Sequence, residues 1–258
     1  MKAQKKLGQN FLINKTALKK IVDALSISEN DIIIEIGAGT GNLTQEILKK
    51  TSKVIAIEKD KSLVKLLKLK FENLSPSLQI IEGDVRDLLP LITKKIRNFK
   101  IVGNIPYYLT GYLLRLLQEL ESPPSLIVFT LQREVAERIA AQPPHMNQLA
   151  AIVQLWTYPE IIFYLKPKDF LPPPKVHSAV VQFQVKSSAE RFKNEKEIIQ
   201  LITRGFKQPR KTLLNNLSRG FDKNKIKKVL ERLNLTEKTR PAELSVEMWI
   251  TLFDYLNS

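Results

Sequence analysis

The sequence predicts an α/β protein built on a doubly wound, mostly parallel sheet, with a small helical domain toward its C-terminal end. Short apolar runs alternate with helical segments about every 20–25 residues, a pattern typical of such sheets. Glycine-rich or polar residues follow the successive apolar runs, at the strand ends where these folds bind ligands. From residue 186 onward the composition changes to basic helical patterns without a strand-like run.

The spacing of apolar residues locates each element. Apolar runs predict five buried strands, at residues 32–36, 54–57, 79–81, 100–103 and 126–129. Helical patterns between them predict helices at residues 15–25, 42–50, 61–72, 109–120 and 133–141. After a rigid break at residues 172–174, the alternating run 176–185 predicts a late antiparallel strand. A boundary near residue 186 then separates a first domain, residues 1–185, from a second, residues 186–258.

The composition excludes several classes of protein. The chain has 258 residues, 43% of them hydrophobic, which is enough for a packed core. No apolar run approaches the ~20 residues that span a bilayer, and the first residues lack the apolar stretch of a secretory signal. With no cysteine and two histidines, disulfides and cysteine-ligated zinc are excluded and no metal site is expected. We expect a cytoplasmic protein without membrane contact.

The charge balance indicates a polyanionic partner. Lys and Arg number 41 against 26 Asp and Glu, a formal charge of +15, and such an excess speeds encounter with nucleic acid. Residues 186–258 carry 16 basic and 9 acidic side chains, whereas residues 1–185 carry 25 and 17. The tail is therefore more than twice as basic per residue, which suits an enzyme that must hold a large polyanion. Solubility, or a genome that favours lysine, is the alternative explanation.

A glycine-rich turn follows the first predicted strand and opens a helix. Gly37, Gly39 and Gly41 let the backbone turn sharply and let a ligand lie against it. This spacing fits a nicotinamide site or an S-adenosylmethionine (SAM) site. Glu58 ends the second strand, where a carboxylate can accept both ribose hydroxyls of either cofactor. Asp84 follows the third strand, where a carboxylate can accept a hydrogen bond from an adenine amino group. This residue favours a SAM site over a nicotinamide site.

The fourth strand ends in Asn104-Ile105-Pro106-Tyr107, which fits methyl transfer to an exocyclic amine. Such an amine is a poor nucleophile, because its lone pair is delocalised into the ring. The side-chain oxygen of Asn104 and the backbone carbonyl of Ile105 can accept its two N–H bonds and direct the lone pair toward a methyl group. Pro106 stiffens the turn, and Tyr107 can stack on a flipped base. An ordinary turn with a packed aromatic side chain is the alternative.

Taken together, these motifs resemble the KsgA-type ribosomal RNA adenine dimethyltransferases, whose relatives include the erythromycin-resistance methylases of large-subunit RNA. The resemblance runs nearly from end to end and rests on the following segments: Gln9-Asn10-Phe11-Leu12, Glu35-Ile-Gly-Ala-Gly-Thr-Gly41, Glu58-Lys-Asp60, Gly83-Asp84, Asn104-Ile-Pro-Tyr107, Gln132-Arg-Glu-Val-Ala-Glu-Arg138, Phe170-Leu-Pro-Pro-Pro-Lys-Val176 and Arg204-Gly-Phe…Arg210-Lys-Thr-Leu-Leu-Asn-Asn216. It implies a Rossmann-like, SAM-dependent methyltransferase sheet of seven strands, mostly parallel with one antiparallel, and a small C-terminal α-helical domain. Residues 1–185 would bind SAM and catalyse the transfer, and residues 186–258 would bind RNA.

The resemblance also implies roles for single residues. It assigns SAM binding to Asn10, Leu12, Gly37, Glu58, Asp84 and Asn104. Asn10 and Leu12 would cover the cofactor, and Asn104 would bridge cofactor and target amine, so the expected catalytic residues are Asn104 and Tyr107. Tyr107 and Phe170 would sandwich the target base, although Phe170 by itself looks like an ordinary core aromatic residue.

Basic residues in the tail are candidates for RNA binding. We expect the substrate RNA to contact three that lie beside Phe206, namely Lys207, Arg210 and Lys211. A second basic cluster lies at residues 223–228, and for both clusters we favour phosphate contacts over a merely solvated face. Three N-terminal lysines fit either a segment that orders on ligand or a frayed terminus: Lys2, Lys5 and Lys6.

The late motifs resemble the small-subunit RNA enzyme rather than the resistance methylases. That resemblance implies dimethylation of two adjacent adenosines in the 3′-terminal hairpin loop of 16S rRNA, within the immature 30S subunit, by an enzyme that we expect to be a monomer. Methylation of an adenine in large-subunit rRNA and a non-catalytic assembly factor are the alternatives, and an oxidoreductase has no use for Asn-Ile-Pro-Tyr. The chain departs from the family at residues 141–152, where a Gly and an Arg of the family are absent, a change that bears on RNA rather than on the cofactor.

Overall fold

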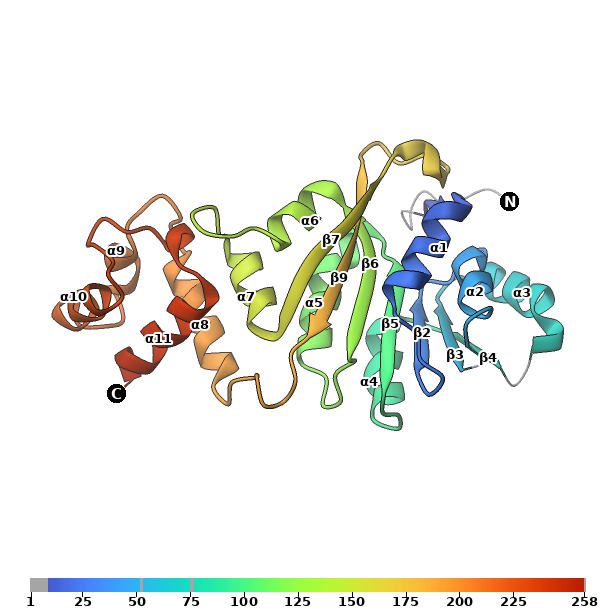
Figure 1. The fold of residues 1–258 in the computed structure, drawn as a ribbon, viewed down its shortest axis with the longest axis horizontal. Helices are drawn as coiled ribbons and strands as arrows, with labels where there is room; N and C mark the ends of the chain where they lie inside the picture. The colour runs from blue at the N-terminus through green and yellow to red at the C-terminus, as the bar shows by residue number, and fades with distance from the viewer. Residues whose placement is uncertain (1–8, 52, 75–76, 258) are drawn as a thin grey trace. The chain divides into compact units, whose positions relative to one another are not determined.

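The computed structural model describes residues 9–51, 53–74 and 77–257, so the lysines at positions 2, 5 and 6 lie outside the described residues. The described residues form a seven-stranded sheet with strand order β4-β3-β2-β5-β6-β9-β7 and a two-stranded sheet, β1-β8 (Figure 1). The strands are β1 (Phe11–Leu12), β2 (Ile32–Ile36), β3 (Val54–Glu58), β4 (Leu78–Glu82), β5 (Phe99–Asn104), β6 (Leu126–Gln132), β7 (Thr157–Leu165), β8 (Phe170–Leu171) and β9 (Ser178–Val185). The helices are α1 (Lys15–Ala24), α2 (Asn42–Ile47), α3 (Lys61–Lys70), α4 (Val85–Thr93), α5 (Thr110–Gln118), α6 (Arg133–Ile139), α7 (Gln148–Trp156), α8 (Glu195–Gly205), α9 (Leu213–Leu217), α10 (Lys223–Arg232) and α11 (Val246–Asn257).

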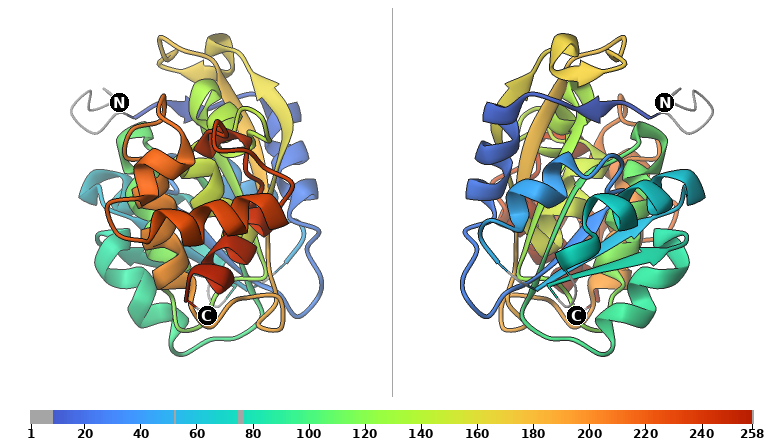
Figure 2. Two further views of the ribbon diagram at one scale, coloured as in Figure 1. Left: turned by 90° about the vertical axis from the view of Figure 1, so that its left-hand side faces the viewer. Right: turned by 90° about the vertical axis from the view of Figure 1, so that its right-hand side faces the viewer.

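The larger sheet confirms the predicted fold class. β2 pairs in parallel with β3 and β5, β3 with β4, and β5 with β6, whereas β9 runs antiparallel to β6. Helices lie on both faces, with α1 and α2 on one side and α5 on the other (Figure 2). Apolar residues of α1 and α2, among them Ile21 and Ile47, share a core with sheet residues such as Ile33 and Val102. Burial on both faces explains why these strands are continuous apolar runs rather than alternating ones.

Two helices and one long strand, together with the two short strands β1 and β8, were not predicted from the sequence. β7 is an edge strand that contains Pro159, and its exposed positions carry large side chains such as Tyr158 and Tyr164. Proline within an apolar run argues against a central strand and is tolerated at the edge of a sheet. α4 contains Pro90, which by sequence alone predicts the end of a helix. α7 begins within residues 141–152, the segment that departs from the family pattern, and continues to Trp156.

The chain divides into two compact units. One comprises the described residues up to Ala136 together with Tyr158–Val185 and holds most of both sheets. The other comprises Glu137–Thr157 together with the chain from Lys186 onward. No helix of the described residues is long and apolar enough to cross a membrane.

The helical unit has a core of its own. Phe206 and Trp249 lie within it with ring centroids 5.7 Å apart. Met146, Ala150 and Leu155, from the segment before β7, are buried in the same core. The sequence analysis left this segment in the first domain, whereas the structure packs it with the helices. The division of labour between a SAM-binding domain, residues 1–185, and an RNA-binding domain, residues 186–258, stays a prediction.

Candidate functional site

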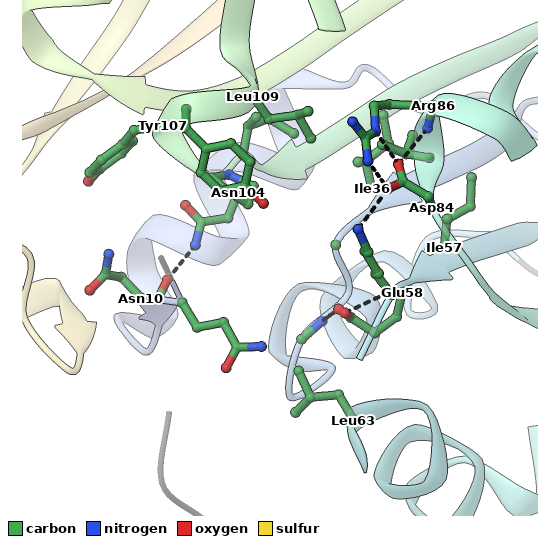
Figure 3. Close-up of a pocket in the computed structure, with 18 of the residues that line it drawn as sticks. Asn10, Ile36, Ile57, Glu58, Leu63, Asp84, Arg86, Asn104, Tyr107 and Leu109 are labelled. Carbon is green, nitrogen blue, oxygen red and sulfur yellow. Dashed lines mark hydrogen bonds and ion pairs between the residues drawn. The ribbon is translucent and has the colours of Figure 1, made fainter. Parts of the chain in front are cut away.

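The carboxyl ends of four neighbouring strands meet at one edge of the larger sheet. β4, β3, β2 and β5 are parallel neighbours, and Ile36 at the end of β2 lies opposite Ile57 and Gly103. A cavity of about 220 Å³ opens at this edge (Figure 3). Six of the residues predicted from the sequence line it: Asn10, Gly37, Glu58, Asp84, Asn104 and Tyr107. The fold therefore brings together side chains from separate strand ends, as the sequence analysis expected.

The glycine-rich turn after β2 forms one wall of the cavity. Gly37 and Gly41 have φ angles of +70° and +75°, which favour glycine because other residues meet steric strain there. A Cβ atom at Gly41 would come within 2.7 Å of the Phe71 ring, so packing also requires glycine at this position. A Cβ atom at Gly37 would meet nothing within 4 Å. Gly37 thus faces open space that a ligand can occupy.

Glu58, at the end of β3, is held by backbone donors. Its Oε1 accepts from the N–H groups of Lys59 at 2.8 Å and Asp60 at 2.9 Å, and its Oε2 accepts from the N–H of Gly39 at 2.9 Å. A carboxylate offers about four lone-pair positions, so one position, on Oε2, remains. The structure therefore holds Glu58 rigidly with room for one hydroxyl donor, and a second hydroxyl must replace one of the backbone bonds.

Asp84 caps the N-terminus of α4 and is surrounded by cations. Its Oδ1 accepts from the backbone N of Arg86 at 3.0 Å and from Arg86 Nε at 2.9 Å, and its Oδ2 accepts from Arg86 Nη2 at 2.7 Å and Lys59 Nζ at 2.9 Å. Hydrogen bonds from Arg86, and then from Lys59, hold the pKa of Asp84 well below its usual range. Asp84 is therefore anionic, and four donors occupy its about four acceptor positions.

Asn104 ends β5, and its amide is held in one orientation. Nδ2 of Asn104 donates to the backbone carbonyl oxygen of Asn10 at 2.6 Å (Figure 3). A carbonyl oxygen only accepts, so the atom facing it is the amide nitrogen. Oδ1 of Asn104 then points away from Asn10, and no donor among the described residues occupies it. The site thus presents a fixed acceptor at the end of β5.

The two tyrosines after Pro106 differ in exposure. The Tyr107 hydroxyl lies 2.9 Å from Oγ of Ser178, which fixes its ring, and burial raises the pKa of the phenol, so Tyr107 stays protonated. Tyr108 also lines the cavity, and 69% of it is exposed. Sequence reasoning singled out Tyr107 and missed Tyr108, although the adjacent aromatic residue was a signal that a second ring stands at the opening.

Leu12 and Phe170 lie apart from this cavity, side by side in the small sheet. Leu12 in β1 pairs with Phe170 in β8, and they are 5% and 2% exposed within the core. Nδ2 of Asn14 donates to Asp169 Oδ1 at 2.8 Å, which ties the same two segments together. No base can stack on the Phe170 ring in this conformation. The place of Phe170 in a base sandwich stays a prediction that requires this region to move. A contact of Leu12 with the cofactor stays a prediction.

Glu35 lies behind the glycine-rich turn, and sequence reasoning assigned it no role. It is 1% exposed and accepts from Thr44 Oγ1 at 2.6 Å. Burial raises the pKa of Glu35 to about 8, although the hydrogen bond from Thr44 lowers it, and the neighbouring Glu58 carboxylate adds to the rise. Glu35 is therefore a largely neutral acid at pH 7. The signal in the sequence was a carboxyl-bearing residue inside an apolar run that is predicted to be buried.

The basic residues Lys207, Arg210 and Lys211 are exposed on the helical unit. None forms an ion pair with a carboxylate of the described residues. Their loop is held by Asn216, whose Oδ1 accepts from the N of Gln208 at 3.0 Å and whose Nδ2 donates to the O of Gln208 at 3.1 Å. The loop therefore presents three unneutralised cations on a braced backbone.

The second basic cluster, on α10, is partly engaged within the protein. Lys227 Nζ lies 2.8 Å from a carboxylate oxygen of Glu237, and Lys225 Nζ donates to the carbonyl of Leu256 at 3.0 Å. Lys223 and Lys228 are exposed. The α10 cluster therefore offers less free positive charge than its sequence suggests.

Comparison with known proteins identifies the family. The model of the ribosomal RNA adenine dimethylase family matches residues 1–258. The chain belongs to the ribosomal RNA adenine dimethylase family. The ribosomal RNA small subunit methyltransferase A of Mycoplasma capricolum is 36% identical to it over 263 residues, which cover 99% of this chain and 98% of the relative. These findings confirm the resemblance drawn from the motifs, and they make the chain an rRNA adenine dimethyltransferase.

Two solved structures share the fold. A dimethyladenosine transferase from Plasmodium falciparum is 28% identical with a TM-score of 0.80, over 94% of this chain and 95% of that one. The 23S rRNA methyltransferase ErmE is 20% identical with a TM-score of 0.79, over 96% of this chain and 100% of that one. The predicted Rossmann-like methyltransferase fold is confirmed by both.

Proposed function

We propose that this chain binds SAM in the cavity at the sheet edge and dimethylates two adjacent adenosines in the 3′-terminal hairpin loop of 16S rRNA. The substrate would be the immature 30S subunit, methylated in the cytoplasm by a monomer. The name of the relatives, small subunit methyltransferase A, supports this target, as do the late motifs. The observation that carries the chemistry is the 2.6 Å bond from Asn104 to the Asn10 carbonyl, which leaves Oδ1 of Asn104 as an acceptor.

The residues of the cavity fit SAM. Gly37 leaves open space for the methionine part, Glu58 keeps one acceptor position for a ribose hydroxyl, and Asp84 is a carboxylate for the adenine amino group. Asn10 and Asn104 line the same cavity. When bound, SAM supplies an electrophilic methyl group on a sulfonium.

The residues after β5 activate the target amine by orienting it. Oδ1 of Asn104 and the backbone carbonyl of Ile105 each accept one N–H bond, which draws the nitrogen out of conjugation with the ring and directs its lone pair. Both acceptors are positioned before the base arrives, so little reorganisation accompanies the reaction. The nitrogen becomes positively charged as its new bond forms, and its proton then leaves without an ionised general base. Tyr107 and the exposed Tyr108 supply rings that can hold a flipped base.

A methyl-transfer assay tests this function. Small-subunit particles that lack the modification are incubated with the protein and labelled SAM, and the methylated nucleotides are mapped by mass spectrometry. We expect two dimethyladenosines in the 3′-terminal hairpin loop, and none within the same reaction time with Asn104→Ala. Large-subunit particles are offered in a parallel reaction, and label in their rRNA alone would contradict the proposed target. Equal support of ribosome maturation by both proteins, without transfer by either, would identify a non-catalytic assembly factor.

A further inference from the structure

Asp84, the residue proposed to receive the adenine amino group, is already engaged on every side. Arg86 and Lys59 together donate four hydrogen bonds of 2.7–3.0 Å to its two oxygens. Three of these come from side chains and one from the backbone of Arg86. An adenine amino group can therefore reach the carboxylate only if a side-chain donor leaves it.

The two cations are free enough to leave. The side chains of Lys59 and Arg86 are 58% and 47% exposed, whereas that of Asp84 is 15% exposed. The Arg86 guanidinium also lies 5.9 Å from the ring centre of Tyr112 while it is bonded to Asp84, so this contact belongs to the closed arrangement. Lys59, Asp84 and Arg86 all line the cavity, and Figure 3 labels Asp84 and Arg86. The donors can thus swing outward while the carboxylate stays in place at the N-terminus of α4.

We propose that Arg86 and Lys59 form a clamp on Asp84 that competes with the adenine amino group of the methyl donor and so sets its affinity. This inference rests on the proposed function, because it takes the cavity as the SAM site. The clamp lowers donor affinity by the free energy needed to open it. The clamp also keeps Asp84 fully negatively charged as an acceptor at the adenine position. A purine without a donor at this position therefore gains no hydrogen bond when the clamp opens.

The clamp predicts an unusual dependence on salt. Salt weakens exposed ion pairs, so raising its concentration should loosen the clamp and strengthen donor binding. S-adenosylhomocysteine (SAH), the product form of SAM, carries no net charge, so its own electrostatic attraction to the protein changes little. RNA binding should change in the opposite direction, because salt weakens phosphate contacts.

Calorimetric titration with SAH tests the clamp. Arg86→Gln keeps the backbone hydrogen bond to Asp84 and removes the two bonds from the Arg86 side chain. Lys59→Gln removes the single bond from the Lys59 side chain. Exposed ion pairs of this kind change affinities about two- to fivefold, so we expect each variant to bind SAH tighter by that factor and to lose the gain with salt. Arg115→Gln is the matched control, because Arg115 is an exposed arginine paired with Glu119 outside the cavity. It should bind SAH as the wild type does, and melting temperatures confirm that each variant folds.

An SAH analogue whose purine lacks the 6-amino group separates competition from a general charge effect. If the amino group and Arg86 compete for Asp84, Arg86→Gln tightens SAH but leaves the affinity for the analogue within about twofold. Equal tightening of both ligands would overturn the clamp, since Arg86 would then act through bulk charge or size. Unchanged or weaker SAH binding by the two Gln variants would also overturn it. A wild-type protein that does not bind SAH would overturn the proposed donor site and the clamp with it.

Discussion

Lys207, Arg210 and Lys211 allow a quantitative test of RNA binding, because no carboxylate of the described residues neutralises them. Each phosphate neutralised by a cation contributes about 0.7–0.9 to the slope of the logarithm of affinity against the logarithm of salt concentration. Replacing all three by glutamine should therefore reduce this slope by about two to three. Between 0.1 and 0.3 M salt, the affinity of the wild type should fall about tenfold more than that of the variant.

The assay is a salt titration of binding to a 16S rRNA fragment that contains the 3′-terminal hairpin. Three ion-paired lysines of the sheet unit provide a control of equal charge: Lys50, Lys61 and Lys94. Their triple glutamine variant should reduce the slope by less than one, because each lysine is already partnered by a carboxylate. A slope that is unchanged in the Lys207, Arg210 and Lys211 variant would remove these residues from the RNA-binding surface.

Four further expectations follow from the site. Asn104→Ala should lower kcat about 100- to 1000-fold, as loss of one positioned transition-state contact does, while RNA affinity in a filter-binding assay changes little. Glu58→Gln should raise the KM for SAM about tenfold, the effect of ~1.4 kcal/mol for one hydrogen bond, with the KM for RNA unchanged. The contribution of neutral Glu35 to the free energy of unfolding is complete below pH about 4.5 and is lost as pH rises through its folded pKa of about 8. The free energy of unfolding should therefore fall on the order of 4 kcal/mol between pH 5 and pH 8. Glu35→Gln should abolish this fall, as measured by urea unfolding at the two pH values. Asn216→Ala should weaken RNA binding, because it removes the side chain that holds the loop at Gln208. Asn215→Ala should leave RNA binding unchanged, because the exposed Asn215 side chain forms no hydrogen bond among the described residues.

The sheet and four of the polar or glycine residues that line the cavity could be predicted because their signals are local. An apolar run buried on both faces marks a parallel strand, and the polar residues that follow it must lie at the common edge of the sheet. Gly37, Glu58, Asp84 and Asn104 were found in this way, and all four line the cavity. The same reasoning could not show that Asp84 is engaged by Lys59, which lies 25 residues earlier in the chain, because such a contact depends on the completed fold.

The small sheet, by contrast, could not be predicted from local signals. β1 and β8 have two residues each, too few for a periodic pattern, and Phe11 pairs with Leu171 from far along the chain. Phe170 could be assigned a function only through resemblance, whereas its own sequence context predicted a core residue. The structure buries it, as that context predicts. Pairings between such distant short segments depend on the completed fold and leave no trace in local sequence.

The position of the small sheet explains how a buried Phe170 can still matter for chemistry. The orientation of the Asn104 amide depends on the Asn10 carbonyl, and Asn10 directly precedes β1. β1 is fixed by its pairing with β8 and by the core burial of Leu12 and Phe170. The bond between Asn14 and Asp169 adds a second tie to the same pair of segments. The side-chain oxygen of Asn104, which we propose aligns the target amine, is therefore held in place by the packing of β1 and β8. The Phe170 motif would then act on the proposed chemistry through Asn10 without touching the base.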